Sequence, residues 1–436
     1  MPAKKLNQLP VDILILIIQK LTLNDIFNLM LTCKVLKNLI INNNAIWRPI
    51  SRRRFINTGK YCYTSLSWYN RCRISHNWCK AIYKNNGIIY HKTNYMPWVK
   101  FHNSEVLLLT VGSDVYCHHV DKNGFPNGRH VQWHLSMPKI KRYDKRTDDI
   151  SRFVLKDNLL VCGNRNGSTA VYKVDNLLVK PQLIQYEKDC LQNGTVEVSA
   201  VDIINNKDNT YIVTVSTGSP IVLFWSWDAD RSHTNISSSG SDFAVSFGLD
   251  LNGEDASYFG AKCVALNENG DKLAVGPDGN SKPLLIDLNI AEFVIKSDES
   301  ANVNQIVQDI QWHDENTICY VTHSGWLQMM DIRTHQVVYD TEDPFQAAFY
   351  CVKTDGHRAI VAGTSQHSRC VLYDTRKPQH TQLYFTQEKR KSTPVYSLDF
   401  DSTKLIAAVD RGVAALNFNV PSYTAARDYS HVYLNL

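Results

Sequence analysis

Few residue patterns in this 436-residue chain suit catalysis. Gly59-Lys60 is followed by Tyr61 and lacks the upstream glycine of a phosphate-binding P-loop, so no phosphate cradle is expected. Gly276-Pro277-Asp278-Gly279 is interpreted as a turn between two strands, since no helix opens after it. The adjacent His118 and His119 would point to opposite faces of a strand, which predicts one buried and one exposed ring.

The cysteines give no sign of a metal or redox centre. There are eleven, they are scattered along the chain, and no two follow the C-x-x-C spacing of zinc sites. No acid, base or nucleophile motif converges elsewhere in the sequence. We therefore expect a non-catalytic protein without cofactor or metal, although an enzyme whose catalytic residues are scattered along the sequence remains an alternative.

Composition and charge narrow the kinds of partner. The chain has 44% hydrophobic and 20% charged residues, as soluble globular proteins do. A net charge of +5 is a slight excess over a large surface and predicts no nucleic-acid partner. The apolar stretch Val11–Ile18 is shorter than the roughly 20 residues of a membrane span, and no signal-peptide cleavage site follows it. We expect a cytoplasmic or nuclear protein with no membrane partner.

The first fifty residues carry the strongest helical pattern. Apolar residues at 9, 13, 14, 17, 18 and 21 lie on one helical face, and Pro10 suits the first turn because its missing N–H needs no partner there. Asn24 and Asp25 are interpreted as the cap of a second helix, and a third is expected over Thr32–Ile41. Three helices this short bury too little surface to be stable alone, so the segment needs a partner within or outside the chain.

The order of these residues resembles the F-box family. The matching stretches are Leu9-Pro10-x-Asp12-Ile13-Leu14-x-x-Ile17-Ile18-x-x-Leu21, Asp25-Ile26, Thr32-Cys33-Lys34-x-Leu36 and Ile46-Trp47-Arg48. The resemblance implies binding to a Skp-type adaptor and, through it, to a cullin-RING ubiquitin ligase. By position, the implied adaptor contacts are Leu9, Pro10, Ile13, Leu14, Ile17, Ile18, Leu21, Ile26, Leu29, Cys33, Leu36 and Trp47. Each of these could instead belong to the intramolecular core, and the whole segment could be a helical cap on the next domain.

Beyond residue 100 the pattern changes to short strand-like runs separated by turn residues. Similar units end at Asp287, Asp331, Asp374 and Asn417, spaced by 44, 43 and 43 residues. Upstream, Leu159–Asp175 and Tyr211–Asp228 show the same hairpin ending, and Val106–Asp121 is a poorer copy. Ser232–Ser246 is interpreted as an inserted loop. The seven units resemble WD-repeat blades, which implies a closed propeller, although only Trp227-Asp228 keeps the namesake dipeptide.

These patterns predict a mostly β fold preceded by a small all-α domain. We expect a tail at 1–8, a three-helix F-box domain at 9–50, a helical and aromatic linker and lead-in at 51–100 with a possible strand at 87–91, and a seven-bladed WD-repeat propeller at 101–436. Nearly the whole chain resembles F-box/WD-repeat proteins of the dactylin type. That resemblance implies a substrate receptor of an SCF-type (Skp-cullin-F-box) ubiquitin ligase, whose propeller binds the protein to be ubiquitinated.

The turns between the second and third strand of each blade are the expected target-binding surface. Arginine clusters can bind phosphate or carboxylate in bidentate fashion, which predicts a phosphorylated or acidic target, with solvated loops as the alternative. The predicted contacts are Arg165, His323, Trp326, Gln366, Arg369 and Arg411.

Asp331-Ile332-Arg333 and Asp374-Thr375-Arg376 allow another mechanism. Both resemble the Asp-x-Arg box of receptors for another cullin's propeller adaptor. In that alternative the chain would be a receptor or scaffold without F-box-dependent degradation, and each Asp could also simply order its turn.

Overall fold

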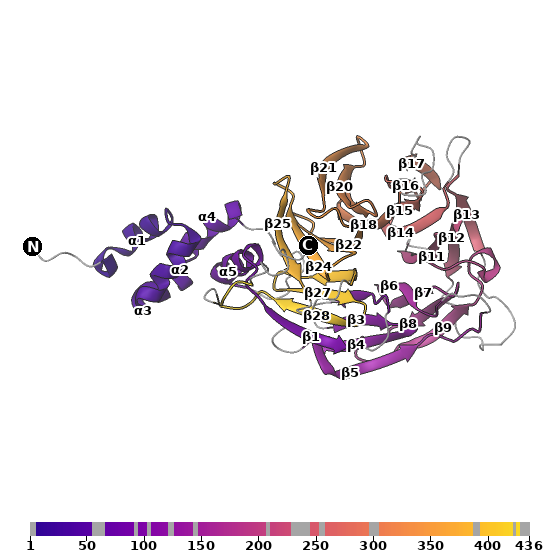
Figure 1. Ribbon diagram of the computed structural model, residues 1–436, viewed down its shortest axis with the longest axis horizontal. Helices are drawn as coiled ribbons and strands as arrows, with labels where there is room; N and C mark the ends of the chain where they lie inside the picture. Colours follow the sequence, from indigo (N-terminus) through magenta and orange to yellow (C-terminus); the bar gives the residue numbers. More distant parts are fainter. Residues whose placement is uncertain are drawn as a thin grey trace, which may run out of the picture.

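The computed structural model describes residues 6–54, 66–90, 95–102, 106–120, 126–142, 147–205, 210–227, 245–252, 258–295, 305–386, 393–421 and 424–427. Helices gather at one end of the molecule, and a ring of sheets forms the rest (Figure 1). The helices are η1 (Leu6–Gln8), α1 (Val11–Ile18), α2 (Leu23–Thr32), α3 (Lys34–Asn42), α4 (Asn44–Arg54) and α5 (Trp68–Cys79), and the short η2 (Gln192–Gly194) lies in a connection between two blades.

Seven four-stranded antiparallel sheets form the ring, so the mostly β class and the seven blades are confirmed. Three blades come first: β2 (Val99–His102), β3 (Val106–Val111), β4 (Asp114–Val120), β5 (Pro126–Ser136); β6 (Ile150–Lys156), β7 (Leu159–Asn164), β8 (Thr169–Lys173), β9 (Gln182–Glu187); and β10 (Ala200–Asn205), β11 (Thr210–Ser216), β12 (Ser219–Trp227), β13 (Val245–Asp250). Three follow: β14 (Gly260–Leu266), β15 (Lys272–Asp278), β16 (Leu284–Asp287), β17 (Glu292–Ile295); β18 (Val307–Asp314), β19 (Thr317–Thr322), β20 (Trp326–Asp331), β21 (Gln336–Glu342); and β22 (Phe349–Thr354), β23 (Ala359–Thr364), β24 (Arg369–Asp374), β25 (His380–Phe385).

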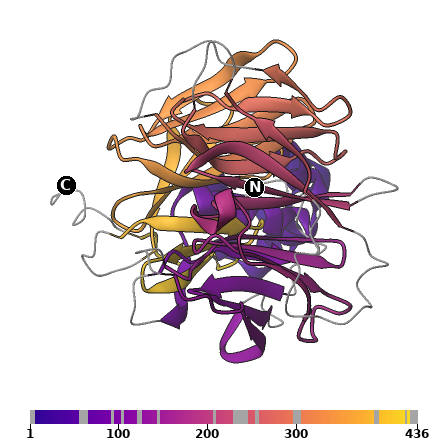
Figure 2. The ribbon, with the colours of Figure 1, turned by 90° about the vertical axis from the view of Figure 1, so that its right-hand side faces the viewer.

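The seventh blade closes the ring with strands from both ends of the chain. It contains β26 (Val395–Phe400), β27 (Lys404–Val409) and β28 (Gly412–Asn417), and its outermost strand is β1 (Lys84–Tyr90). Figure 2, seen from the side opposite the helices, shows the yellow strands from the end of the chain among the purple strands from its beginning. Pairing of β1 with β28 therefore joins the two ends of the ring.

The ring begins earlier than the sequence placed it. Both β1 and β2 start before residue 101, within the segment assigned to a linker and lead-in. The strand expected at 87–91 is part of β1, and residue 91 lies outside the described residues. Counting repeats by the end of the third strand could not reveal this start, because the last blade takes its fourth strand from the other end of the chain.

Carboxylates on the innermost strands link neighbouring blades, with Asp309 and Asp399 buried and Asp202 partly buried. Asp202 accepts a hydrogen bond from the Leu266 N–H at 2.9 Å, and Asp309 accepts one from the Val352 N–H at 2.9 Å. Asp399 accepts from the Phe101 N–H at 2.8 Å, which links the last blade to the first. Charge-assisted hydrogen bonds of this kind are stronger than neutral ones, so each carboxylate fixes the spacing between two blades.

Small residues on the second strands let adjacent blades pack closely. A Cβ on Gly276 would lie 2.2 Å from the Cys263 Sγ and 2.9 Å from Val307 of the following blade. Gly363 repeats this arrangement beside Cys351, at 2.6 Å, and Val395, at 2.8 Å. The stretch Gly276-Pro277-Asp278 is therefore strand, not the turn that the sequence suggested, and the turn begins at Gly279. The expectation for the histidine pair is confirmed, since His118 is buried and His119 exposed.

The helical end contains α1 to α4, one helix more than expected before residue 55. Thr22, rather than Asn24 or Asp25, caps α2 and forms a capping box in which Asp25 returns the hydrogen bond. In α4, Pro49 cannot donate to the Ala45 carbonyl oxygen four residues earlier. The Gln19 Nε2 donates to that oxygen instead, at 3.0 Å, so the end of α1 is fastened to α4.

Helix α5 packs on both parts of the molecule. Cys72 belongs to the helical core, and its Sγ lies 3.7 Å from the Trp47 carbonyl oxygen. Trp78 belongs to the ring core, where its ring stacks on Phe418 at 3.8 Å and its Nε1 donates to the Ser402 carbonyl oxygen at 2.9 Å. The helix thus joins the helical end to the ring, as its position in Figure 1 shows. No helix in the described part of the chain has the length and apolarity to cross a membrane.

Candidate functional site

Helix α1 is apolar on nearly all sides, and this gives it two faces to cover. Its inner face is buried in the helical core, where Leu14 is 3% and Ile18 1% exposed. Its outer face is open, with Ile13 46%, Leu16 58% and Ile17 38% exposed. A short helix that leaves this much branched aliphatic surface in water fits a protein-binding role.

The predicted adaptor contacts separate into two groups. Leu14, Ile18, Ile26, Leu36 and Trp47 are buried, so their assignment as adaptor contacts is corrected, because in this structure they hold the helices together. Trp47 is fully buried and its Nε1 donates to the Ile40 carbonyl oxygen at 2.7 Å. The structure leaves accessible Pro10, Ile13 and Ile17, and in part Leu9, Leu21, Leu29 and Cys33.

Sequence reasoning missed several exposed apolar residues at this end. Leu6, Val11 and Leu16 flank or belong to α1 and are 42%, 51% and 58% exposed. Leu31 and Val35, near the junction of α2 and α3, are 69% and 60% exposed. The sequence could have revealed them, because they are apolar residues that lie outside the one helical face predicted to be buried. These five residues with Ile13 and Ile17 are called the outer apolar surface below.

The ring presents the predicted target-binding turns on one rim. Innermost strands all start at this rim, so the turns between second and third strands and the connections between blades meet there. We call it the turn face, and its second-to-third turns are residues 112–113, 165–168, 217–218, 279–283, 323–325, 365–368 and 410–411. His323, Gln366 and Arg411 are exposed on it, Trp326 is 39% exposed, and the Arg165 side chain is 20% exposed.

Arg369 is the exception, and its assignment as a target contact is corrected. Its side chain and that of Asp343 are both 0% exposed. The Arg369 Nη2 lies 2.7 and 2.6 Å from the two Asp343 carboxylate oxygens, and the guanidinium lies 4.5 Å from the Phe345 ring centre. Breaking a buried pair of this kind is strongly unfavourable, so Arg369 stabilises its blade instead of meeting a partner.

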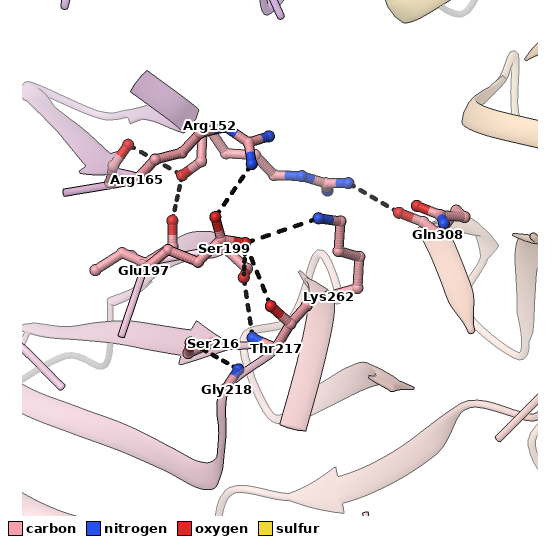
Figure 3. Close-up of polar contacts among 12 residues, drawn as sticks. Arg152, Arg165, Glu197, Ser199, Ser216, Thr217, Gly218, Lys262 and Gln308 are labelled. Atoms are coloured by element: carbon pink, nitrogen blue, oxygen red, sulfur yellow. Dashed lines mark hydrogen bonds and ion pairs between the residues drawn. The ribbon is translucent and has the colours of Figure 1, made fainter. Parts of the chain in front are cut away.

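Glu197 gathers the cations of the neighbouring blades, as Figure 3 shows. Its carboxylate lies 3.1 Å from the Arg165 Nη1 and 3.9 Å from the Lys262 Nζ. The Ser199 and Thr217 hydroxyls are also within hydrogen-bond distance, at 3.1 and 3.3 Å. Burial alone would raise the pKa of Glu197, but Lys262, Arg165 and the two hydroxyls together lower it, so the group is ionised at neutral pH.

Arg152 crosses the mouth of the central channel. It starts on β6, and its Nη1 lies 2.9 Å from the Asp309 carboxylate on β18. Its Nη2 donates to the Gln308 carbonyl oxygen at 3.2 Å (Figure 3). The guanidinium also lies 4.3 Å from the Trp98 ring centre. A channel cavity of about 460 Å³ adjoins these groups, lined also by Lys100, Lys156 and Lys353 among others. This cross-channel link had no sequence signal, since residue order does not reveal which blades face each other.

Comparisons with known proteins agree with both parts of the structure. A family model described as F-box-like matches residues 6–53. The mouse and human proteins named F-box/WD repeat-containing protein 4 are 21% and 20% identical over 425 residues, which cover 95% of this chain and 93% of each relative.

Solved structures resemble the ring. A chain in the crystal structure of the mitotic checkpoint complex aligns with a TM-score of 0.55 at 11% identity, covering 77% of this chain and 90% of that one. Sqt1 of Saccharomyces cerevisiae aligns with a TM-score of 0.50 at 14% identity, covering 72% and 80%. At these identities the likeness shows the fold alone. The chain thus carries an F-box-like domain followed by a seven-bladed propeller, resembles F-box/WD-repeat proteins over nearly its whole length, and has the domain organisation typical of non-catalytic substrate receptors in SCF-type ubiquitin ligases.

Proposed function

We propose that this chain binds a Skp-type adaptor through the outer apolar surface and captures a protein for ubiquitination on the turn face of its propeller. Ubiquitin transfer then takes place on other subunits, and the chain contributes proximity. The observation that carries the proposal is α1, which buries Leu14 and Ile18 in its own domain while leaving Ile13, Leu16 and Ile17 in water. The compartment we propose is the cytoplasm or nucleus, consistent with ten free cysteines among the described residues.

The outer apolar surface supplies the driving force for adaptor binding. Its seven members are between 38% and 69% exposed, so each can bury roughly half of a large aliphatic side chain on contact. Complete burial of such a side chain contributes about 1.5–3 kcal/mol, and half of that gives about 1 kcal/mol for each. Replacing two of them by aspartate would in addition force charges against an apolar partner.

Co-purification tests adaptor binding with matched variants. Ile13→Asp with Ile17→Asp should abolish recovery of the adaptor and cullin, because both side chains lie on the outer face of α1. Val179→Asp is the control, since Val179 is 60% exposed on the propeller, far along the chain from the helices. Equal recovery of the ligase by both variants would contradict the proposal, provided that circular dichroism shows both chains folded.

The contact between the helical end and the ring disfavours binding of another cullin's propeller adaptor to the Asp-x-Arg box at Asp374. The Arg376 Nη2 lies 2.5 Å from the Asp374 carboxylate, and both residues line a cleft of about 480 Å³ whose opposite wall includes Leu23 and Ile50 of the helical end. A second adaptor would have to reach Arg376 past the F-box-like domain. The box at Asp331 is open, with the Arg333 side chain 66% exposed and 2.6 Å from its own aspartate, so Arg333→Glu tests that mechanism directly. Loss of ligase recovery in this variant would support the alternative.

A further inference from the structure

A cavity of about 330 Å³ lies on the turn face where the first, second, third and seventh blades meet. Its lining includes the aromatic residues Tyr95 and Tyr396 and the charged residues Asp149, Arg165 and Glu197. The volume is about ten times that of a water molecule in the liquid. The turn-face cavity, as we call it, is therefore large enough for a side chain of another protein.

Asp149 is a buried carboxylate, and few neighbouring groups offset the cost of removing its charge from water. The residue is 9% exposed, and its side chain accepts a hydrogen bond from the Thr147 hydroxyl. Among the described residues it forms no ion pair, because the nearby Arg165 is directed at Glu197, 3.1 Å away. Burial raises the pKa of Asp149, while Arg165 and Thr147 offset this only in part. A desolvated carboxylate in this state gains from an added cation.

Two aromatic residues, Tyr95 and Tyr396, belong to the lining, and Asp410 interacts with both. The Tyr396 hydroxyl is hydrogen-bonded to Asp410, and the Tyr95 N–H donates to the Asp410 carbonyl oxygen at 3.1 Å. Tyr350 adds an edge-to-face contact with Tyr396 at 5.8 Å. Aromatic faces beside carboxylates attract ammonium and guanidinium groups. The described residues contain no cluster of three or more metal-ligating side chains, so an organic cation fits better than a metal ion.

An anionic group has fewer binding partners in this cavity, because the nearby cations already pair with carboxylates. Arg165 and Lys262 are held by Glu197, Arg152 by Asp309, and Arg369 is buried against Asp343. In the turn-face cavity a phosphate or carboxylate would have to compete with Glu197 for Arg165, whereas a cation would meet Asp149, which has no ion pair among the described residues. The cavity itself therefore favours a cationic guest, and an acidic or phosphorylated target at other residues of the turn face, such as Arg411, stays a prediction.

We propose that the turn-face cavity receives a basic side chain, lysine or arginine, of the captured protein, with Asp149 as its anionic partner and Tyr95 and Tyr396 against its aliphatic and cationic parts. This inference rests on the proposed function, because it names the chemistry of the captured protein. It assigns to Asp149 a role in specificity that the turn residues chosen from sequence did not include.

Blocked tripeptides test the cavity on the full chain without adaptor. The probes are acetyl-Gly-X-Gly-amide with arginine, lysine, glutamine or phosphoserine as X, followed by saturation-transfer NMR and titration. We expect the arginine and lysine peptides to bind and the other two to give no signal. Asp149→Asn should weaken binding of the arginine peptide at least about tenfold. The control is Asp148→Asn, which removes the same charge from an exposed neighbour that accepts from the Asn166 Nδ2 at 3.0 Å, and it should change affinity less than about twofold.

Urea unfolding distinguishes a variant that has lost the binding site from one that no longer folds. Because the folded-state pKa of Asp149 lies above its unfolded value, the charged form opposes folding, and Asp149→Asn should raise the urea midpoint at pH 7 while removing peptide binding. Tyr95→Leu, which removes an aromatic ring from the lining, should also weaken binding of the arginine peptide. Preference for the phosphoserine peptide, or undiminished arginine binding by Asp149→Asn, would overturn the inference. A wild-type chain that binds these peptides but not the adaptor would contradict the proposed function and leave the cavity assignment in place.

Discussion

Replacing Asp309 by asparagine tests whether the ring is held across its channel as well as between adjacent blades. The Asp309 side chain is 2% exposed, and it accepts from the Val352 N–H while pairing with Arg152 at 2.9 Å. Asparagine has nearly the same shape and keeps an oxygen for the Val352 N–H. The oxygen that faces Arg152 also accepts from the Ile310 N–H at 3.1 Å, so the variant removes the charge pair together with this local bond. The bond between neighbouring blades stays in place.

The expected loss of unfolding free energy depends on how well Arg152 is still compensated once its ion pair with Asp309 is removed. Leaving one member of a buried ion pair unpaired costs about 3–5 kcal/mol. Arg152 is 11% exposed and keeps the Gln308 carbonyl oxygen and the Trp98 ring, so we expect about 2–4 kcal/mol. Arg152→Met should cost a similar amount, since it leaves Asp309 without its cation.

A double-mutant cycle with urea unfolding measures the link itself. We expect Asp309→Asn with Arg152→Met to cost less than the two single changes added together, with a coupling energy of about 1.5–3 kcal/mol. Additive costs would refute the argument that the two side chains act as a pair. A single change below about 0.5 kcal/mol would show that the cross-channel contact contributes nothing to stability.

Three further outcomes follow from individual contacts. Gln19→Ala should destabilise the helical end by about 1 kcal/mol, because the Ala45 carbonyl oxygen loses its donor, and amide exchange in α1 and α4 should accelerate. Gly276→Ala should lower the thermal midpoint markedly, since its methyl group would meet the Cys263 Sγ at 2.2 Å; an unchanged midpoint would contradict the close packing of these blades. Burial lowers the pKa of His313, although Asp314 and Asp355 counteract this, so the folded state holds the ring neutral beside the Thr354 hydroxyl at 2.7 Å. Since the unfolded chain then binds the proton first, stability should fall as pH drops below about 6.5, and His313→Gln should reduce that slope in urea titrations at pH 8 and 5.5.

Residue patterns predicted the architecture well wherever the contacts are local. Hairpin turns and the spacing of Asp287, Asp331 and Asp374 revealed blades whose strands pair with their sequence neighbours. The pairing of β1 with β28, which closes the ring, was not predicted, because the two strands lie at opposite ends of the chain. Local pattern carries no information about such a distant partner.

The site was predicted less completely, because burial is decided by packing among elements. Periodicity marked the apolar residues of α1 but could not distinguish Leu14, which is 3% exposed, from Ile13, which is 46% exposed, when both neighbours are aliphatic. The sequence predicted Arg369 to be an exposed cation, but it is buried and paired with Asp343, which lies in the connection before β22. Asp149 was not predicted as a site residue, because its burial and the pairing of the nearby Arg165 with Glu197 depend on how the blades pack.

Hydrogen exchange of the chain with and without a purified Skp-type adaptor tests the central claim most directly. The account predicts slower exchange in α1 and around the junction of α2 and α3, where the outer apolar surface lies, with no change at Asp331 to Arg333 or on the turn face. Protection should disappear in the Ile13→Asp, Ile17→Asp variant. Unchanged exchange in α1 on addition of the adaptor, or protection confined to the propeller, would contradict it.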